Sequence, residues 1–198
     1  MRLRDENKET LIREQAIALI VQEGFDGLSM QKLAKAANLS ASTIYIYFKS
    51  REDLLNQVYI AVDEIFAKEV LKNFDPAMSF EEGLWQQWKN RYKYVQKYPL
   101  HYHFSEQFRN SPLIKHQDIK ESPFRVAMQQ FTKNAIQRKE IVDLPPEILW
   151  ALAYGPFYIL IKFHLDQSSM GGKPFSLSEQ KMKQAFGLVI KALKHAER

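Results

Sequence analysis

The chain has 198 residues, of which 45% are hydrophobic and 13% aromatic, so it can bury a substantial core. It has no cysteine, which excludes a disulfide framework, a thiolate metal site and a cysteine nucleophile, and which suits a cytoplasmic protein. The formal net charge of +5 is modest for this length, so charge indicates nucleic acid only where it is concentrated.

The hydropathy of the chain predicts neither export nor membrane insertion. Residues 1–10 are charged throughout and lack the apolar segment of a signal peptide. The longest apolar run, residues 148–161, is interrupted by Gly155-Pro156 and is shorter than the roughly 20 residues that a membrane span requires. We therefore expect a soluble, cytoplasmic protein with no membrane partner.

The first predicted helix covers residues 10–23 and ends at Gly24. Its apolar residues recur at helical spacing on one face: Ile12, Ala16, Leu19 and Ile20.

Two short helices are predicted next, over residues 29–37 and 41–47. Ser29 and Ser40 are suitable N-caps, and Asn38 can end the first helix because asparagine tolerates a left-handed backbone. Ile44 and Phe48 would be the inward residues of the second helix. Two short helices joined by a tight turn have helix-turn-helix geometry, in which the second helix enters the major groove of DNA.

Positive charge is concentrated on this segment. Residues 29–51 contain Lys32, Lys35, Lys49 and Arg51 and no acidic residue, which favours a surface for phosphates. A generic helical hairpin with solvated lysines would show the same pattern, and the residues alone leave that alternative open.

The segment LSASTIYIYFKSREDLL, residues 39–55, resembles the DNA-binding signature of the tetracycline-repressor (TetR) family of bacterial regulators. The resemblance extends over about residues 10–55, and it departs from the family at Asn38 and Ser42, where glycine is usual. It implies a three-helix DNA-binding head and a helix from Ser50 that links the head to the rest of the chain. The departure at Ser42 puts the operator sequence in doubt rather than DNA binding.

The outward residues of the 41–47 helix supply hydroxyl and apolar groups. Serine, threonine and tyrosine donate to phosphates, and alanine or isoleucine can contact a thymine methyl group. No arginine or asparagine is present for bidentate recognition of a base, so we expect specificity from apolar contacts and DNA shape. Tyr45 could instead be a partly buried core residue. The residues and the resemblance together predict these DNA contacts: Ser29, Ala41, Ser42, Thr43, Tyr45, Tyr47, Lys49 and Arg51.

The rest of the chain is helical in period throughout. The helix from Ser50 continues to about residue 72, and further helices are expected over residues 79–98, 100–110, 123–139, 146–166 and 176–194, with a start at Ser111-Pro112. Capping boxes at Ser79-x-x-Glu82 and Ser176-x-x-Glu179 would open two of them. We predict an all-α fold of about nine helices, with a helix-turn-helix head over residues 1–49 and a larger ligand-binding and dimerisation domain over residues 50–198.

The helix at residues 146–166 is apolar on nearly all sides, so all of its sides should be buried. Either it is central in its own domain, or a second copy of the chain covers its outer face. The resemblance implies the second, a four-helix bundle formed by the last two long helices of each subunit. A dimer also places two recognition helices about 34–36 Å apart.

Aromatic residues are frequent after residue 80. The simplest interpretation is core and dimer packing, and the alternative is an aromatic-lined ligand pocket, which the resemblance implies. The candidate pocket residues are Trp88, Tyr92, Phe104, Phe108, Met128, Phe131, Trp150 and Tyr154.

Nothing in the sequence predicts a metal, a cofactor or catalysis. His101 and His103 are two residues apart on a helix and point in different directions, so they cannot face one ion together with Glu106. The leading hypothesis is a homodimeric repressor that binds a near-palindromic operator in double-stranded DNA and is released by a small apolar or aromatic effector. The alternative is a ligand-sequestering or protein-docking helical module with a non-functional head.

Overall fold

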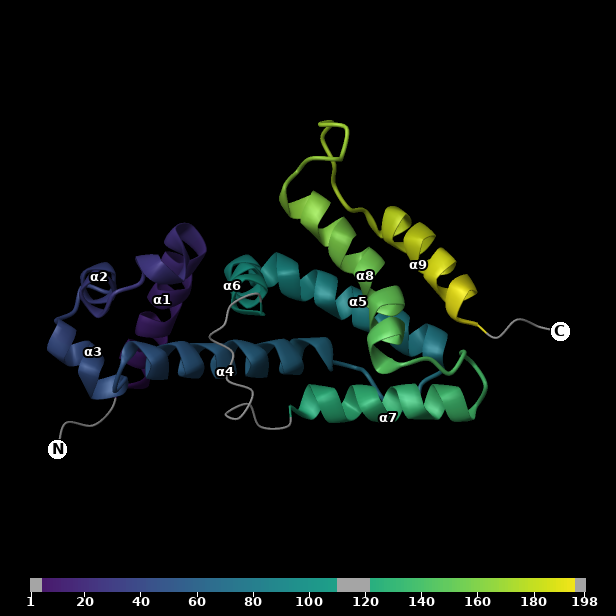
Figure 1. Cartoon of the computed structure of the whole chain (residues 1–198), viewed down its shortest axis with the longest axis horizontal. Helices are drawn as coiled ribbons and strands as arrows, with labels where there is room; N and C mark the ends of the chain where they lie inside the picture. The colour runs from purple at the N-terminus through teal and green to yellow at the C-terminus, as the bar shows by residue number, and fades with distance from the viewer. Residues whose placement is uncertain (1–4, 110–121, 195–198) are drawn as a thin grey trace. The chain divides into compact units, whose positions relative to one another are not determined.

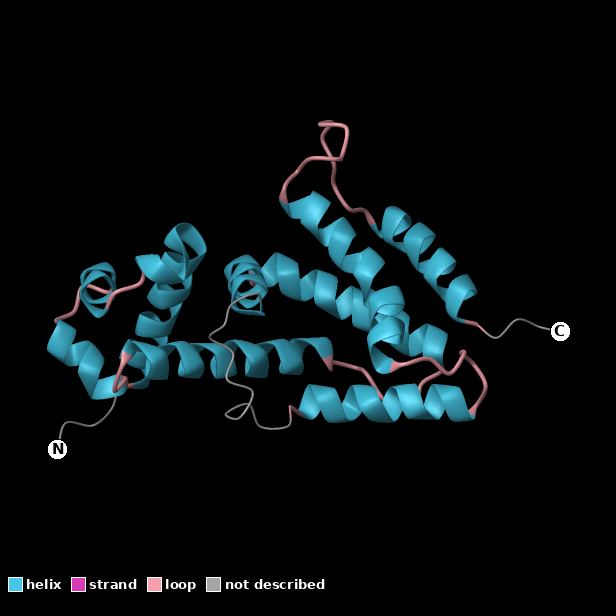
Figure 2. Ribbon diagram, in the orientation of Figure 1, coloured by secondary structure: helices cyan, strands magenta, loops and turns pink. Residues whose placement is uncertain are grey.

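The computed structural model describes residues 5–109 and 122–194, which form nine α-helices and no β-strand (Figures 1 and 2). The predicted all-α class is confirmed. The helices are α1 (Glu6–Gly27), α2 (Met30–Ala36), α3 (Ala41–Tyr47), α4 (Arg51–Val70), α5 (Phe80–Lys97), α6 (Pro99–Arg109), α7 (Pro123–Gln137), α8 (Pro146–Leu165) and α9 (Glu179–Leu193). The predicted start at Ser111-Pro112 lies outside the described residues.

The chain divides into two compact units. The first comprises Met1–Lys68 and Tyr94–Ser122, and the second comprises Glu69–Lys93 and Pro123–Arg198. The first unit therefore holds α1, α2, α3, nearly all of α4, and α6. It extends beyond residues 1–49 because α4 and α6 complete its core, and a functional boundary at residue 50 stays a prediction.

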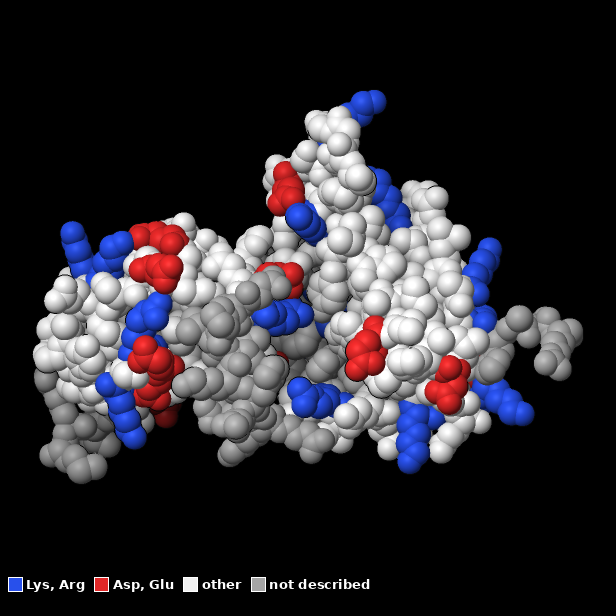
Figure 3. Space-filling view, viewed as in Figure 1, with Lys and Arg blue, Asp and Glu red and all other residues white. Residues whose placement is uncertain are grey.

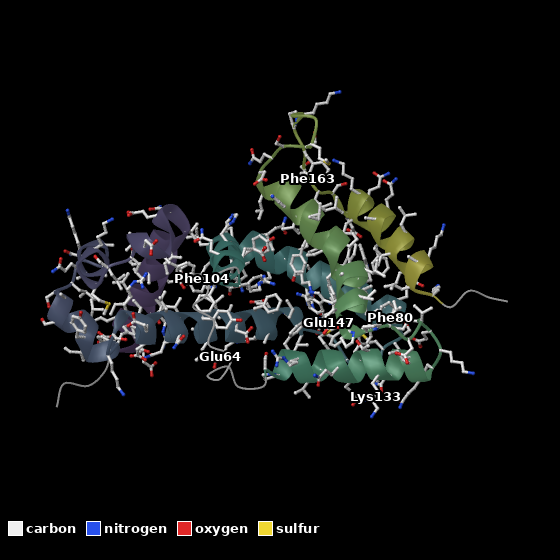
Figure 4. All side chains as sticks on the ribbon, viewed as in Figure 1. Glu64, Phe80, Phe104, Lys133, Glu147 and Phe163 are labelled. Carbon is white, nitrogen blue, oxygen red and sulfur yellow. The ribbon has the colours of Figure 1, made fainter. Side chains whose placement is uncertain are left out.

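The core of the first unit is built from the apolar faces of its five helices. Ile12 and Ile20 of α1, Leu33 of α2 and Ile44 of α3 are completely buried in one hydrophobic cluster. Phe104 of α6 belongs to the same cluster, and Figure 4 shows its ring among the helices of this unit. Burial of each large apolar side chain contributes about 1.5–3 kcal/mol, so α6 stabilises the helix-turn-helix region directly.

The second unit packs α5 against α7, α8 and α9. Trp88 of α5 is completely buried, its indole Nε1 donates to the carbonyl of Ala153 on α8 at 3.0 Å, and its ring contacts Phe186 of α9. Phe131 of α7 stacks on Phe80 at the start of α5; Phe80 is labelled in Figure 4. These aromatic contacts fix the helices of the unit side by side.

Several helix ends differ from the sequence expectation. α1 begins at Glu6, earlier than residue 10, because the side chain of Asp5 caps it by accepting from the N–H groups of Asn7 and Lys8. Gly24, with φ of 75°, kinks α1 rather than ending it, since the helix continues to Gly27. The predicted cap of the last helix is wrong, since Ser178 rather than Ser176 accepts from the N–H of Lys181.

α8 is apolar, but the other helices of its unit leave part of its surface exposed. In the described part of the chain, α8 is the one helix that is long and apolar enough to cross a membrane, judged by length and composition. Only 28% of its most apolar 18-residue stretch is buried. Its exposed apolar residues are Ile148, Trp150, Leu152 and Ile159. The alternative in which α8 is buried on all sides within one chain is therefore wrong.

Candidate nucleic-acid interface

The turn between α2 and α3 is held by backbone hydrogen bonds of a Schellman motif. The N–H of Leu39 donates to the carbonyl of Ala34 at 2.9 Å, and the N–H of Asn38 donates to that of Lys35 at 3.2 Å. Asn38 has φ of 53°, the left-handed conformation that this motif needs. Asparagine adopts it more readily than other residues with a Cβ, which explains how the chain makes the turn without glycine.

Ser29 and Ser40 cap α2 and α3 as predicted. Ser29 Oγ accepts from the N–H of Lys32, and Ser40 Oγ accepts from the N–H of Thr43, each at 3.1 Å. These bonds satisfy backbone donors that the first turn of a helix leaves unpaired. The two caps therefore fix where each short helix begins.

α3 turns one face into the first unit and the other toward solvent. Ile44 and Phe48 are completely buried, as predicted. On the opposite face, Tyr45 and Ile46 are 53% and 50% exposed, and Ser42 is also exposed. An interpretation of Tyr45 as a core residue is therefore wrong.

Tyr47 is placed differently from the sequence expectation. It is only 6% exposed and belongs to the hydrophobic core of the first unit, so the expectation that Ile44 and Phe48 are the only core residues of this segment is wrong. Its hydroxyl accepts a hydrogen bond from the N–H of Asp5 at 3.2 Å. Tyr47 follows Ile44 by three residues, so helical spacing allows both side chains to lie on the inward face. The sequence therefore contained a signal for the burial of Tyr47.

The start of α4 is capped by side chains of the protein. Ser50 Oγ accepts from the N–H of Asp53 at 3.1 Å, and an Asp53 carboxylate oxygen accepts from the N–H of Lys49 at 2.7 Å. The carboxylate of Asp53 thus occupies part of the helix terminus beside Lys49, one of the predicted DNA contacts. The ammonium group of Lys49, which is exposed, remains the group at this position that suits a phosphate.

The Arg51 side chain is directed into the first unit. Its guanidinium donates from Nε to the carbonyl of Leu28 at 3.0 Å and from Nη2 to the carbonyl of Phe25. Phe25 lies in the last turn of α1 and Leu28 follows that helix, so Arg51 joins the start of α4 to the end of α1 and the segment that leads into α2. The sequence did not indicate this positioning role.

Basic side chains remain on the α2 surface. Figure 3 shows them over α2, with acidic side chains beside them over α1. The ammonium group of Lys32 lies 2.6 Å from the carboxylate of Glu23 on α1, and both side chains are largely exposed. Exposed ion pairs contribute at most about 1 kcal/mol, so this pair leaves the lysine able to exchange its partner for a phosphate.

Comparison with known proteins decides what this arrangement is. Residues 12–58 match the model of the bacterial regulatory proteins of the tetR family, and residues 81–173 match a tetracyclin repressor-like C-terminal domain. An uncharacterised HTH-type transcriptional regulator of Haemophilus influenzae is 34% identical over 68% of this chain and 71% of its own length. The chain belongs to the TetR family.

Solved structures agree with this membership. A TetR-family regulator from Marinobacter aquaeolei superposes with a TM-score of 0.82 at 24% identity, over 98% of both chains. The TetR-family regulator HI0893 from Haemophilus influenzae does so with a TM-score of 0.78 at 26% identity, over 98% of this chain and all of its own. TetR-family proteins are DNA-binding transcriptional regulators rather than enzymes, and the family predicted from residues 39–55 is confirmed.

The eight candidate ligand residues of this TetR-family protein are divided between the two units. Phe104 and Phe108 lie in the first unit, where they contact Phe25, whereas the other six lie in the second. Phe131 and Trp88 are core residues of the second unit, and Met128 and Tyr154 are also buried. Tyr92 donates from its hydroxyl to the carbonyl of Leu177, and Trp150 is 39% exposed.

A buried arginine lies among the aromatic residues of the second unit. Arg91 of α5 is 1% exposed, and its Nη1 donates to the Tyr158 hydroxyl at 2.6 Å. Its guanidinium carbon lies 4.5–5.8 Å from the ring centroids of Tyr154, Phe124, Trp150 and Tyr158. Burial raises the pKa of Tyr154 to about 12 in spite of this cation, so its hydroxyl is neutral. The sequence signal for Arg91 was its position between Trp88 and Val95 on an inward helical face.

A surface hollow of about 500 Å³ occurs elsewhere in the second unit. It is open and is lined by residues of α5 and α9 and by Ser79: Ser79, Glu81, Glu82, Trp85, Lys183 and Phe186. None of the candidate ligand residues contributes to it. The predicted ligand pocket therefore stays a prediction.

Proposed function

We propose that this protein is a homodimeric repressor that binds a near-palindromic operator and is released from it by a small apolar or aromatic effector. The observation that carries the proposal is the outward face of α3, where Ser42, Tyr45 and Ile46 are exposed beside a turn and two caps that fix the helix. Family membership supports DNA binding and transcriptional regulation.

The proposed DNA surface follows the exposed groups. It consists of α3 together with flanking donors on either side: Ser29, Ala41, Ser42, Thr43, Tyr45, Ile46 and Lys49. Hydroxyl and ammonium groups would contact phosphates, and the apolar side chains would contact bases. Tyr47 and Arg51, which were predicted as contacts, would act by holding α3 and the segment before α2 in place.

The proposed dimer uses the exposed apolar face of α8 together with α9. Ile159 of α8 is 55% exposed and Leu188 of α9 is 65% exposed. A second copy of the chain would cover these apolar side chains and remove them from water. The twofold symmetry of such a dimer would match a symmetric operator.

The proposed effector binds in the second unit. Support comes from the aromatic side chains of α5, α7 and α8 that lie close together, which offer a large apolar surface with a few polar groups. Effector binding would shift α4 and change the separation of the two recognition helices. If the effector favours the separation that does not fit DNA by roughly 1–3 kcal/mol, the affinity for the operator falls enough to release the protein.

The first experiment is selection from a pool of random duplexes with the purified full chain at about 0.15 M salt, where non-specific binding is weak. Enrichment of a twofold symmetric sequence is the expected result. That duplex, labelled with a fluorophore, then serves to screen aromatic and alkyl compounds for release of the protein. Recovery of no common sequence would overturn the proposal and favour a helical module whose head does not recognise an operator.

A further inference from the structure

Ile46 is an apolar side chain on the solvent-facing side of α3. It is 50% exposed, whereas Ile44, two residues earlier, is completely buried. Successive residues of a helix are about 100° apart, so two positions place these side chains on nearly opposite faces. Ser42 lies four residues before Ile46 and therefore on the same face, in line with the exposure of both.

The chemistry of α3 leaves few ways to distinguish base pairs. Its sequence, ASTIYIY, contains no amide, guanidinium or carboxylate, which are the groups that form bidentate hydrogen bonds with bases. The hydroxyls of Ser42 and Thr43 each lie 2.8 Å from Ser40 Oγ, so part of their hydrogen-bonding capacity is used within the helix. Apolar contact is the remaining means of direct recognition.

The base edges in the major groove carry one apolar group, the 5-methyl group of thymine. Tyr45, the other large exposed residue of α3, carries a hydroxyl that suits a phosphate oxygen. The Ile46 side chain has no polar atom, so transferring it from water to an apolar contact is favourable. Of the two, Ile46 is therefore the residue whose chemistry matches a methyl group.

We propose that Ile46 determines operator sequence by packing against the 5-methyl group of one thymine in each half-site. The inference rests on the proposed function, because it requires a sequence-specific dimer on DNA. Removing one buried methyl group costs about 0.8 kcal/mol, which is roughly fourfold in affinity. Removing the corresponding methyl from both half-sites should weaken binding about fifteenfold.

The test replaces each thymine of the selected operator in turn by deoxyuridine, which lacks the methyl group and keeps every hydrogen-bonding group of the base. The same substitution is made in both half-sites, and the dissociation constant is measured for the full chain and for Ile46→Ala. At one position, deoxyuridine should weaken binding of the unmodified protein about fifteenfold. For Ile46→Ala the loss at that position should be less than twofold, because the side chain that contacts the methyl is already removed.

The control is Leu11→Ala, which removes a 41% exposed apolar side chain from α1 of the same unit. It should retain the full effect of deoxyuridine at every position. If deoxyuridine weakens the unmodified protein and Ile46→Ala equally at all positions, or weakens neither, then Ile46 does not contact a thymine methyl. That result leaves the selected operator, and hence the proposed function, intact. Failure to recover any operator would overturn both.

Discussion

The hydroxyl of Tyr47 on α3 accepts a hydrogen bond at 3.2 Å from the backbone N–H of Asp5, the residue that caps α1. The two residues are 42 positions apart in the chain. The hydrogen bond connects the last turn of α3 to the start of α1. The Tyr47 ring packs in the hydrophobic core of the same unit. Tyr47 therefore controls the orientation of α3 from inside the protein.

Two substitutions of Tyr47 distinguish a role of its side chain in core packing from a role in DNA contact. Tyr47→Phe removes the hydroxyl and should lower the free energy of unfolding by about 1 kcal/mol, whereas Tyr47→Ala also leaves a cavity and should cost about 3–5 kcal/mol. Denaturant unfolding of both variants measures these values. We expect Tyr47→Phe to bind the selected operator within threefold of the unmodified protein. A tenfold loss of affinity with unchanged stability would show that the hydroxyl contacts DNA instead.

Arg51→Met should destabilise the first unit without altering the number of phosphate contacts. The variant leaves the carbonyls of Phe25 and Leu28 without their charged donor, and a hydrogen bond to a charged group contributes about 1.5–3 kcal/mol. The dependence of operator affinity on salt concentration should keep its slope. A slope smaller by about 0.9 for each subunit would identify Arg51 as a phosphate contact.

Lys49→Ala should show the opposite behaviour. Loss of one ammonium–phosphate contact per subunit weakens binding to all sequences similarly and reduces the salt slope by about 1.8 for a dimer. Stability should change little, since the Lys49 side chain is exposed. Lys133→Ala is the control, because Lys133 is an exposed lysine on α7 (Figure 4). Equal effects of the two substitutions would mean that the loss reflects net charge alone.

The contact between α1 and α6 should make stability depend on pH. Glu14 Oε1 lies 3.1 Å from Nε2 of His101, which is 4% exposed, and the hydrogen bond from His101 lowers the pKa of Glu14 below 4.5. A carboxyl whose pKa is lower in the folded state adds stability above its unfolded pKa and loses it as pH falls through the folded pKa. The Glu14 side chain is 48% exposed, so the contribution should be under about 1 kcal/mol.

Glu14→Gln tests this dependence. Unfolding of both proteins by denaturant between pH 3 and pH 6 should give a stability difference near pH 6 that disappears as pH falls below 4.5. A difference that is constant across this range would show that the charge of Glu14 does not contribute.

Charges on the exposed face of α8 and α9 should prevent dimerisation. Ile159→Glu and Leu188→Glu each place a carboxylate in the proposed apolar interface, at a cost of roughly 3 kcal/mol or about 100-fold in the dimer dissociation constant. Sedimentation should show monomers that keep their helical content and no longer bind the operator tightly. Leu100→Glu, at a 41% exposed position of α6, should remain dimeric. A dimer that persists in both test variants would place the interface elsewhere.

Hydrogen bonds between near neighbours in the chain account for the parts of the fold that were predicted correctly. Ser29 and Ser40 cap their helices within three residues, and Asn38 closes its turn with neighbours at most four residues away. Such bonds depend on residue type and spacing along the chain, so the bounds of α2 and α3 and the helix-turn-helix could be predicted. The resemblance of residues 39–55 to a known signature added the family, which comparison confirmed.

The direction of several other side chains depends on contacts between segments that are far apart in the chain. Tyr47 is buried in the core of the first unit and its hydroxyl meets the start of α1, and Arg51 binds carbonyls 23 and 26 residues earlier. The rings around Arg91 come from α7 and α8, far along the chain. Burial and charge pairing depend on which distant segments meet in the folded state, and helical periodicity specifies a face without specifying what covers it.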